Sequence, residues 1–315
     1  MTGLELARAY WETCGEEMLR EQFPDCEQAV AAALTGGGSE CYGYDDGVSR
    51  DHDFEPGFCL FLPGEEIIDR RTAFLMERAY AKLPREFMGF ERQKLNPVGG
   101  PRHGVFRLRE WFTEKIGRMP EELTTEDWLR LPSGALAEAV NGEVFRDDAG
   151  LLTDAREILL HMPEDLRRKR LAGELLLAAQ SGQYNYTRCL AHGETGAAQL
   201  AAAEFVKHAM SAVFWLNRKY QPYYKWSFRA LRELPGGGEL AKGFEWLLST
   251  GNGPEMAEEK AFAIEETASR LICALQEQGL TEASCGDLEK HAYSVNDGIK
   301  DSRVRNMHIL AAAED

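Results

Sequence analysis

The sequence predicts an α+β protein, with a mixed sheet and its helices in the first half of the chain and a helical bundle in the second half. Two short apolar runs, residues 58–62 and 104–108, alternate with segments of helical periodicity, and such short runs indicate buried strands. From residue 120 onward the composition shifts toward residues that favour helices. We therefore expect one domain over residues 1–150 and a helical domain over residues 151–315.

Composition and charge argue against several classes of protein, namely duplex nucleic-acid binders, membrane proteins and zinc proteins. The 315 residues carry a formal net charge of −16, which argues against a duplex nucleic-acid partner because such partners select a basic surface. No apolar run approaches the length of a membrane span, and the N-terminus lacks a basic segment followed by a hydrophobic core. The seven cysteines include no Cys-x-x-Cys pair, which favours reduced thiols over a zinc site. We expect a cytoplasmic protein with no membrane partner.

The first half reads as helix, strand, helix, strand. Apolar residues recur at helical spacing over residues 3–23, where Pro24 follows, and a second helix is expected over residues 26–34. Residues 58–62 read as a buried strand, residues 65–82 as a helix, and residues 104–108 as a third strand.

The second half is read as mostly helical. A short helix is expected to begin at Thr124, and a turn over residues 147–150 is expected either to close a hairpin or to lead into the next helix. Longer helices are expected at residues 154–161, 163–179, 195–219 and 254–279.

A glycine run followed by two aspartates is the most chemically suggestive feature. Residues 36–38 are glycines and are followed by Ser39, and a chain without Cβ atoms lets backbone N–H groups approach a phosphate. Asp51 and Asp53 are one residue apart, so on a strand both carboxylates point to the same face. Such a pair of like charges is stabilised by a divalent cation, and oxygen ligands suit Mg²⁺.

These motifs resemble the nucleotidyltransferase superfamily with the polymerase-beta fold, whose signature is a Gly-Ser pair, a loop of about a dozen residues, and Asp-x-Asp on a strand. Here Gly38 and Ser39 are followed by eleven residues and then by Asp51 and Asp53. Residues 43–53 also resemble a bacterial branch that is a domain of unknown function. The resemblance covers about the first half of the chain at motif level.

The resemblance implies a set of roles. Asp51 and Asp53 would act as catalytic metal ligands that hold Mg²⁺, with Mn²⁺ as a substitute, and a nucleoside triphosphate would be the bound partner. The residues expected to contact the nucleotide in this part of the chain are Gly38, Ser39, Ser49 and Arg50. The alternative for Ser49 and Arg50 is that both only fix the turn.

The third strand departs from the family pattern. Family members usually place a third carboxylate there, but this chain has Arg107. Glu110 is the nearest substitute and is the predicted third catalytic acid, while Glu91 and Glu143 are weaker candidates. The alternative is that all three glutamates are ordinary solvated surface residues.

A stretch rich in cations and aromatic residues, 215–226, lies in the helical half. In related antibiotic-modifying nucleotidyltransferases a helical C-terminal domain covers the cleft, and a lysine from it reaches the nucleotide phosphates. The resemblance implies that residues 151–315 cover the cleft of the first domain in the same way. Lys225 is the predicted equivalent, with Arg188 or Arg229 as companions. The alternative is that the aromatic residues pack between helices and that Lys225 is a solvated charge.

Taken together, these features predict a Mg²⁺-dependent nucleotidyltransferase that moves a nucleoside monophosphate from a nucleoside triphosphate to a hydroxyl of a small-molecule acceptor. The alternative is a catalytically altered nucleotide-binding module, or pseudoenzyme, that senses a ligand or binds a protein partner. The third carboxylate distinguishes the two.

Overall fold

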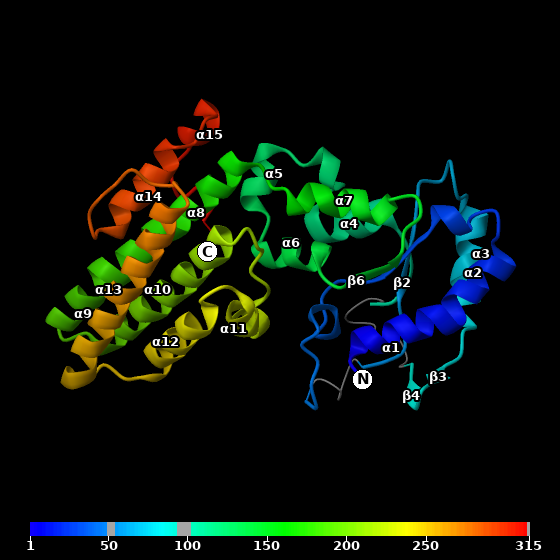
Figure 1. Cartoon of the computed structure of the whole chain (residues 1–315), viewed down its shortest axis with the longest axis horizontal. Coiled ribbons are helices and arrows are strands. Elements are labelled where there is room, and N and C mark those ends of the chain that lie inside the picture. Colours follow the sequence, from blue (N-terminus) through cyan, green and yellow to red (C-terminus); the bar gives the residue numbers. More distant parts are fainter. Residues whose placement is uncertain (49–53, 93–101, 314–315) are drawn as a thin grey trace. The chain divides into compact units, whose positions relative to one another are not determined.

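The computed structural model describes residues 1–48, 54–92 and 102–313. The protein is α+β, as predicted, with a small mixed sheet whose strands lie between residues 31 and 146 and with helices in both halves of the described chain (Figure 1). It divides into two compact units, one of residues 1–123 and 135–161 and the other of residues 124–134 and 162–315.

The sheet of the first unit has the strand order β5-β2-β1-β6. The central strand β1 is antiparallel to β2 and β6, whereas β2 is parallel to β5. The two central strands, β1 and β2, are buried along their whole length. The strands are β1 (Ala31–Leu34), β2 (Cys59–Leu62), β5 (Gly104–Arg107) and β6 (Glu143–Arg146), and a separate two-stranded ribbon is formed by β3 (Glu86–Phe87) and β4 (Phe90–Glu91).

The predicted helix at residues 26–34 is wrong. A short 3-10 turn (Glu27–Ala29) leads instead into β1, the second strand from one edge of the sheet. Its alanines favour a helix in isolation, but hydrogen bonding to neighbours on both sides and burial on both faces override that preference. A continuous apolar run of this length is compatible with a helix or with a buried strand. Here pairing with the neighbouring strands makes it a strand.

The helix predicted from residue 3 is confirmed, as α1 (Gly3–Tyr10), a π-helical turn (Trp11–Gly15) and α2 (Glu16–Gln22). Tyr10 and Trp11 pack against Phe58 in the core, where Tyr80 also contacts the Phe58 ring. Both strands predicted from the apolar runs are confirmed as β2 and β5. The other helices of the first unit are α3 (Arg70–Ala81), α4 (Leu108–Ile116), α6 (Ser133–Val140) and α7 (Leu151–Leu160).

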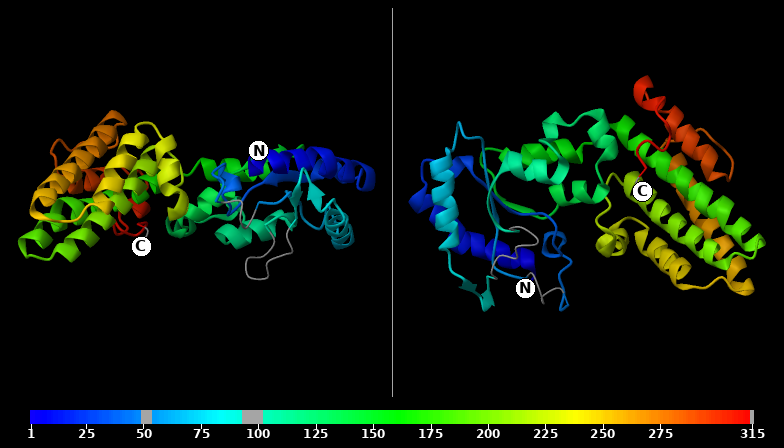
Figure 2. Two further views of the ribbon diagram at one scale, coloured as in Figure 1. Left: turned by 90° about the horizontal axis from the view of Figure 1, so that it is seen from below. Right: turned by 180° about the vertical axis from the view of Figure 1, so that it is seen from behind.

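The second unit is a helical bundle in which α10 packs against both α8 and α13 (Figure 2). The predicted long helices are confirmed, and the short helix at Thr124 has a capping box formed with Asp127. Its helices are α5 (Thr125–Arg130), α8 (Glu164–Ala178), α9 (Thr187–Ala191), α10 (Thr195–Leu216), α11 (Tyr224–Glu233), α12 (Gly237–Ser249), α13 (Pro254–Glu277), α14 (Leu288–Asp297) and α15 (Ser302–Arg305).

Buried Arg170 explains why α5 belongs to the bundle. Its guanidinium lies over the Trp215 ring and donates to the carbonyl oxygens of Trp128 and Leu131, at the C-terminal end of α5. These carbonyls have no partner within their own helix, so a buried cation satisfies them and fixes α5 on the second unit.

Candidate functional site

The glycine loop follows β1 directly and is held by one side chain. Asn141 Oδ1 accepts hydrogen bonds from Gly36 N at 2.9 Å and from Thr35 Oγ1 at 3.1 Å, and Asn141 Nδ2 donates to Gly36 O at 2.8 Å. Gly36 has a φ of +118°, which L-residues with a Cβ rarely adopt. The loop is therefore fixed by the residue that follows α6, more than 100 residues later in the chain.

Asn141 is itself held by a buried arginine. Arg156 of α7 donates from Nη2 to Asn141 O at 2.7 Å. Burial lowers the pKa of Arg156 to about 10, so the side chain is still charged at neutral pH. The peptide group of Asn141 is thus oriented on one side by Arg156, and its amide side chain faces the glycine loop on the other.

A pocket of about 290 Å³ opens beside this loop. Gly36, Gly37 and Gly38 form one side of it, and the start of β5 together with α4 and α6 forms the other. Because an added Cβ at Gly36 would meet no atom within 4 Å, the backbone there is open on its side-chain side. The ionisable side chains that border the pocket are Glu40, Arg102, His103, Glu114, Lys115 and Glu138.

Charges of both signs are arranged along the pocket. Lys115 Nζ lies 2.8 Å from Glu138 Oε2, and Glu138 borders Gly37, where an added Cβ would come within 3.0 Å of its carboxylate. His103 Nδ1 lies 3.4 Å from Glu55 Oε1. The pocket can therefore attract an anion through its cations and a cation through its carboxylates.

The two cysteines beside the pocket are not suited to nucleophilic chemistry. Burial, followed by the charge of Glu40, raises the pKa of the Cys41 thiol well above its ordinary value. Burial also raises the pKa of Cys59 to about 12. Because the thiolate is the reactive form, both side chains act as packing groups at neutral pH.

The predicted site residues have different outcomes. Gly38 borders the pocket, whereas Ser39 is not among the described residues that line it. Ser39 instead begins the 3-10 turn Glu40–Tyr42. Among the described residues there is no group of three His, Cys, Asp or Glu side chains close enough to hold a metal ion. The remaining predicted residues, Ser49, Arg50, Asp51 and Asp53, lie outside the described residues.

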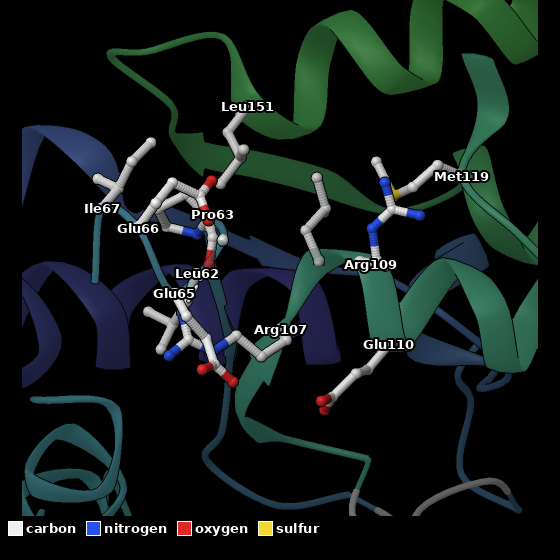
Figure 3. Close-up of a pocket in the computed structure, with 12 residues that line it drawn as sticks. Leu62, Pro63, Glu65, Glu66, Ile67, Arg107, Arg109, Glu110, Met119 and Leu151 are labelled. Atoms are coloured by element: carbon white, nitrogen blue, oxygen red, sulfur yellow. Dashed lines mark hydrogen bonds between the residues drawn. The ribbon is translucent and has the colours of Figure 1, made fainter. Parts of the chain in front are cut away.

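Glu110 lies in a different pocket from the glycine loop. This second pocket, of about 580 Å³, lies where β2 and β5 end and α4 begins, and Glu110 and Arg107 both border it (Figure 3). Arg107 Nη1 donates to Pro63 O at 2.6 Å, so this arginine joins the ends of two parallel strands. None of the residues lining this pocket belongs to the glycine loop, and Glu110 as third acid stays a prediction.

The comparisons with known proteins give one partial match. A family model for a domain of unknown function (DUF4037) matches residues 128–227. No curated protein and no solved structure matches the chain. The matched region contains Glu138, Asn141 and Lys225 and does not include the glycine loop or the aspartate pair.

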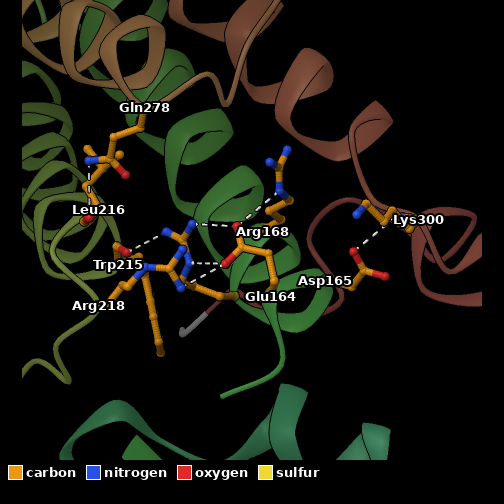
Figure 4. A network of polar contacts seen from close by, with 9 residues as sticks. Glu164, Asp165, Arg168, Trp215, Leu216, Arg218, Gln278 and Lys300 are labelled. Carbon is orange, nitrogen blue, oxygen red and sulfur yellow. Dashed lines mark hydrogen bonds and ion pairs between the residues drawn. The ribbon is translucent and has the colours of Figure 1, made fainter. Parts of the chain in front are cut away.

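The cation-rich stretch of the second unit is partly engaged in ion pairs. Arg218 Nη1 lies 2.9 Å from Glu164 Oε2, and Arg167 and Arg168 also bind this carboxylate (Figure 4). Burial alone would raise the pKa of Glu164, but the hydrogen bonds and charges of the arginines lower it overall. This cluster stabilises the bundle.

Lys225 is exposed, and its Nζ lies 4.9 Å from the centre of the Trp226 ring. Its predicted contact with nucleotide phosphates stays a prediction.

Among the described residues, no helix combines the length and the apolar character that a bilayer crossing needs.

Sequence reasoning did not find Asn141, Lys115 or Glu138. Each is common on protein surfaces, and each is far from the glycine run in sequence. Only the pairing of β6 with β1 brings the end of α6 to the loop. Glu40, two residues after Gly38, was close enough in sequence to be considered, but its burial could not be predicted from the local pattern.

Proposed function

We propose that the chain is a Mg²⁺-dependent nucleotidyltransferase that transfers a nucleoside monophosphate from a nucleoside triphosphate to a hydroxyl of a small molecule. The observation that carries the proposal is the glycine loop, which follows a central strand directly and presents its backbone to a pocket with Lys115 and Arg102 on its border. Phosphate oxygens are bound by such backbone N–H groups and by nearby cations.

The size of the pocket suggests which part of the nucleotide it holds. Its volume of about 290 Å³ lies at the lower end of the ~300–1,000 Å³ typical of small-molecule sites. In this proposal the triphosphate occupies the pocket and the nucleoside extends beyond it. Lys115 exchanges its pairing with Glu138 for pairing with phosphate.

The proposal assigns the divalent cation to the aspartate pair. Three carboxylates border the pocket, Glu40, Glu114 and Glu138, but no three His, Cys, Asp or Glu side chains among the described residues are close enough together to hold a metal ion by themselves, and Mg²⁺ prefers hard oxygen ligands. In the proposal Asp51 and Asp53 are the main ligands. When bound, Mg²⁺ would offset the charge that develops on the leaving pyrophosphate.

The alternative is a nucleotide-binding module without transfer activity. It is favoured by Arg107, which occupies the family's third-carboxylate position and is bonded to Pro63 O. A module of this kind would bind the triphosphate and Mg²⁺ but would release no pyrophosphate. It would act as a ligand sensor or as a partner for another protein.

The test is thermal unfolding with each of the four ribonucleoside triphosphates and Mg²⁺. A ligand that binds only the folded state raises the midpoint, by about 2.7 kcal/mol of stability at 100 times its Kd. We expect one or more nucleotides to do so in the wild-type protein and none in the Asp51→Asn, Asp53→Asn double variant. The matched control is Asp148→Asn, which removes an exposed carboxylate that pairs with Arg146.

Pyrophosphate release then separates the two functions. Pyrophosphate release that depends on an added hydroxyl acceptor supports nucleotide transfer. Thermal stabilisation by a nucleotide without pyrophosphate release supports the nucleotide-binding module without transfer activity. No stabilisation by any nucleotide, or the same stabilisation in the double variant, would contradict the proposal.

A further inference from the structure

We propose that Glu138 is an internal competitor of the anion that the glycine loop binds. Its carboxylate, paired with Lys115, occupies the space beside Gly37 and has to leave before a phosphate enters. The inference concerns the regulation of the proposed site, and it rests on the proposed function in one respect, that the glycine loop binds a phosphate-bearing anion. Neither a metal ion nor a nucleoside takes part in it.

The three glycines of the loop differ in what lies on their side-chain side. A Cβ added at Gly36 would meet no atom within 4 Å, so the backbone there is open. A Cβ added at Gly37 would come within 3.0 Å of Glu138 Oε1, and one added at Gly38 would overlap with the carboxylate of Glu40. An anion therefore finds free space at the first glycine and a carboxylate at each of the next two.

Of these two carboxylates, Glu138 is the one that can turn away. Glu40 is buried, at 7 % exposure, and a Cβ added at Gly3 of α1 would overlap with the Glu40 Cβ, so this turn packs closely on the helix. The side chain of Glu138 is 28 % exposed, and its Oε2 lies 2.8 Å from Lys115 Nζ. Rotation about its side-chain bonds can carry the Glu138 carboxylate toward solvent while the backbone stays in place.

An anion with several negative charges can take the place of this carboxylate. Partly exposed ion pairs such as that of Lys115 with Glu138 are weak, because water competes for both charges. A triphosphate carries more negative charge than a carboxylate and attracts the Lys115 ammonium more strongly. A phosphate at Gly37 is also repelled by the Glu138 carboxylate as long as that carboxylate stays there. Glu138 therefore lowers the affinity of the loop for every anion that reaches Gly37.

The loop keeps its shape when the carboxylate leaves. Thr35 Oγ1 donates to the carbonyl oxygen of Glu138 at 3.2 Å, and Asn141 holds both the N–H and the carbonyl oxygen of Gly36. These contacts use the backbone of Glu138 and the side chain of Asn141, so they do not depend on the Glu138 carboxylate. The end of α6 thus supports the glycine loop with some of its groups and covers it with another.

The test measures binding of inorganic tripolyphosphate to the full chain by titration calorimetry in metal-free buffer. The variant Glu138→Gln keeps the shape of the side chain and removes its charge. We expect it to bind tripolyphosphate about fivefold more tightly than the wild type, because the competing contact is no stronger than a partly exposed ion pair. Glu138→Ala, which adds no hydrogen-bond donor, should show a similar gain.

The matched control is Glu122→Gln. Glu122 pairs with Arg109 at 2.9 Å, and neither residue borders the glycine-loop pocket. This control should bind tripolyphosphate with wild-type affinity, whereas Lys115→Gln should bind it more weakly than the wild type. Hydrogen exchange in peptides that cover residues 31–38 should be unchanged in ligand-free Glu138→Gln, which separates competition for the anion from support of the loop.

Unchanged or weaker binding of tripolyphosphate by both Glu138 variants, or an equal gain in Glu122→Gln, would overturn the inference. If the Glu138 variants bind tripolyphosphate as the wild type does, the competitor is excluded and the proposed function stands. If they bind it more tightly but no nucleotide with Mg²⁺ stabilises the wild type, the competitor stands and the proposed function fails. If neither the wild type nor the variants bind tripolyphosphate, both fail.

Discussion

The replacement Asn141→Ala should destabilise the first unit and open the glycine loop at the same time. The substitution removes three hydrogen bonds, two to the backbone of Gly36 and one from Thr35 Oγ1. At about 1 kcal/mol for each bond, the expected loss is about 3 kcal/mol. For a unit of this size that corresponds to a fall in the unfolding midpoint of roughly 6 to 12 °C.

Hydrogen exchange followed by mass spectrometry measures the amide exchange rates of the two units separately in the full chain. We expect faster exchange in peptides that cover β1 and the glycine loop and unchanged exchange in α10. The matched control is Asn217→Ala in the second unit, because Asn217 makes a single side-chain hydrogen bond, to Val213 O of its own helix, and should cost about 1 kcal/mol. Equal effects of the two variants, or wild-type exchange at the loop in Asn141→Ala, would refute the reasoning.

Three further predictions test the fold. Gly142→Ala should lower the free energy of unfolding in urea by several kcal/mol, because φ of Gly142 is +71° and the new Cβ would overlap with the carbonyl oxygen of Leu34. The control Gly193→Ala, where φ is +76° and no atom lies near the new Cβ, should lower it by only about 1 kcal/mol. Equal losses in the two variants would contradict the packing at Gly142. Because the pKa of Glu164 is lowered on folding, the free energy of unfolding should fall as pH drops below about 4.5, and Glu164→Gln should flatten that dependence; an unchanged pH profile would exclude this linkage. Iodoacetamide at pH 8 should leave Cys59 unmodified in the folded protein, because burial raises its pKa to about 12, and rapid modification would contradict its burial.

Much of the fold could be predicted because local patterns agree with it. Local pattern is sufficient to predict β2 and β5, which are short apolar runs next to glycine or proline. It is also sufficient for α8, α10 and α13, which show helical periodicity. β1 could not be assigned, because an alanine-rich run suits a helix and only its neighbours in the sheet decide otherwise.

The site was predictable only where its residues are consecutive. The glycine run was recognised because glycine has a distinct conformational role. The side chains that complete the pocket come from α4, from α6 and from the start of β5, and their positions depend on how these elements pack on the sheet. Closeness in sequence to the third strand makes Glu110 the predicted third acid, but the first turn of α4 places it beside the second pocket.

The central claim is that the glycine-loop pocket holds a nucleoside triphosphate together with a divalent cation. The most direct measurement is a crystal structure of the chain soaked with Mn²⁺ and a non-hydrolysable triphosphate, in which the anomalous signal of manganese locates the metal. We expect phosphate density against Gly36, Gly37 and Gly38 and a manganese peak next to that density. Triphosphate or manganese bound elsewhere, with the pocket filled only by water, would contradict it.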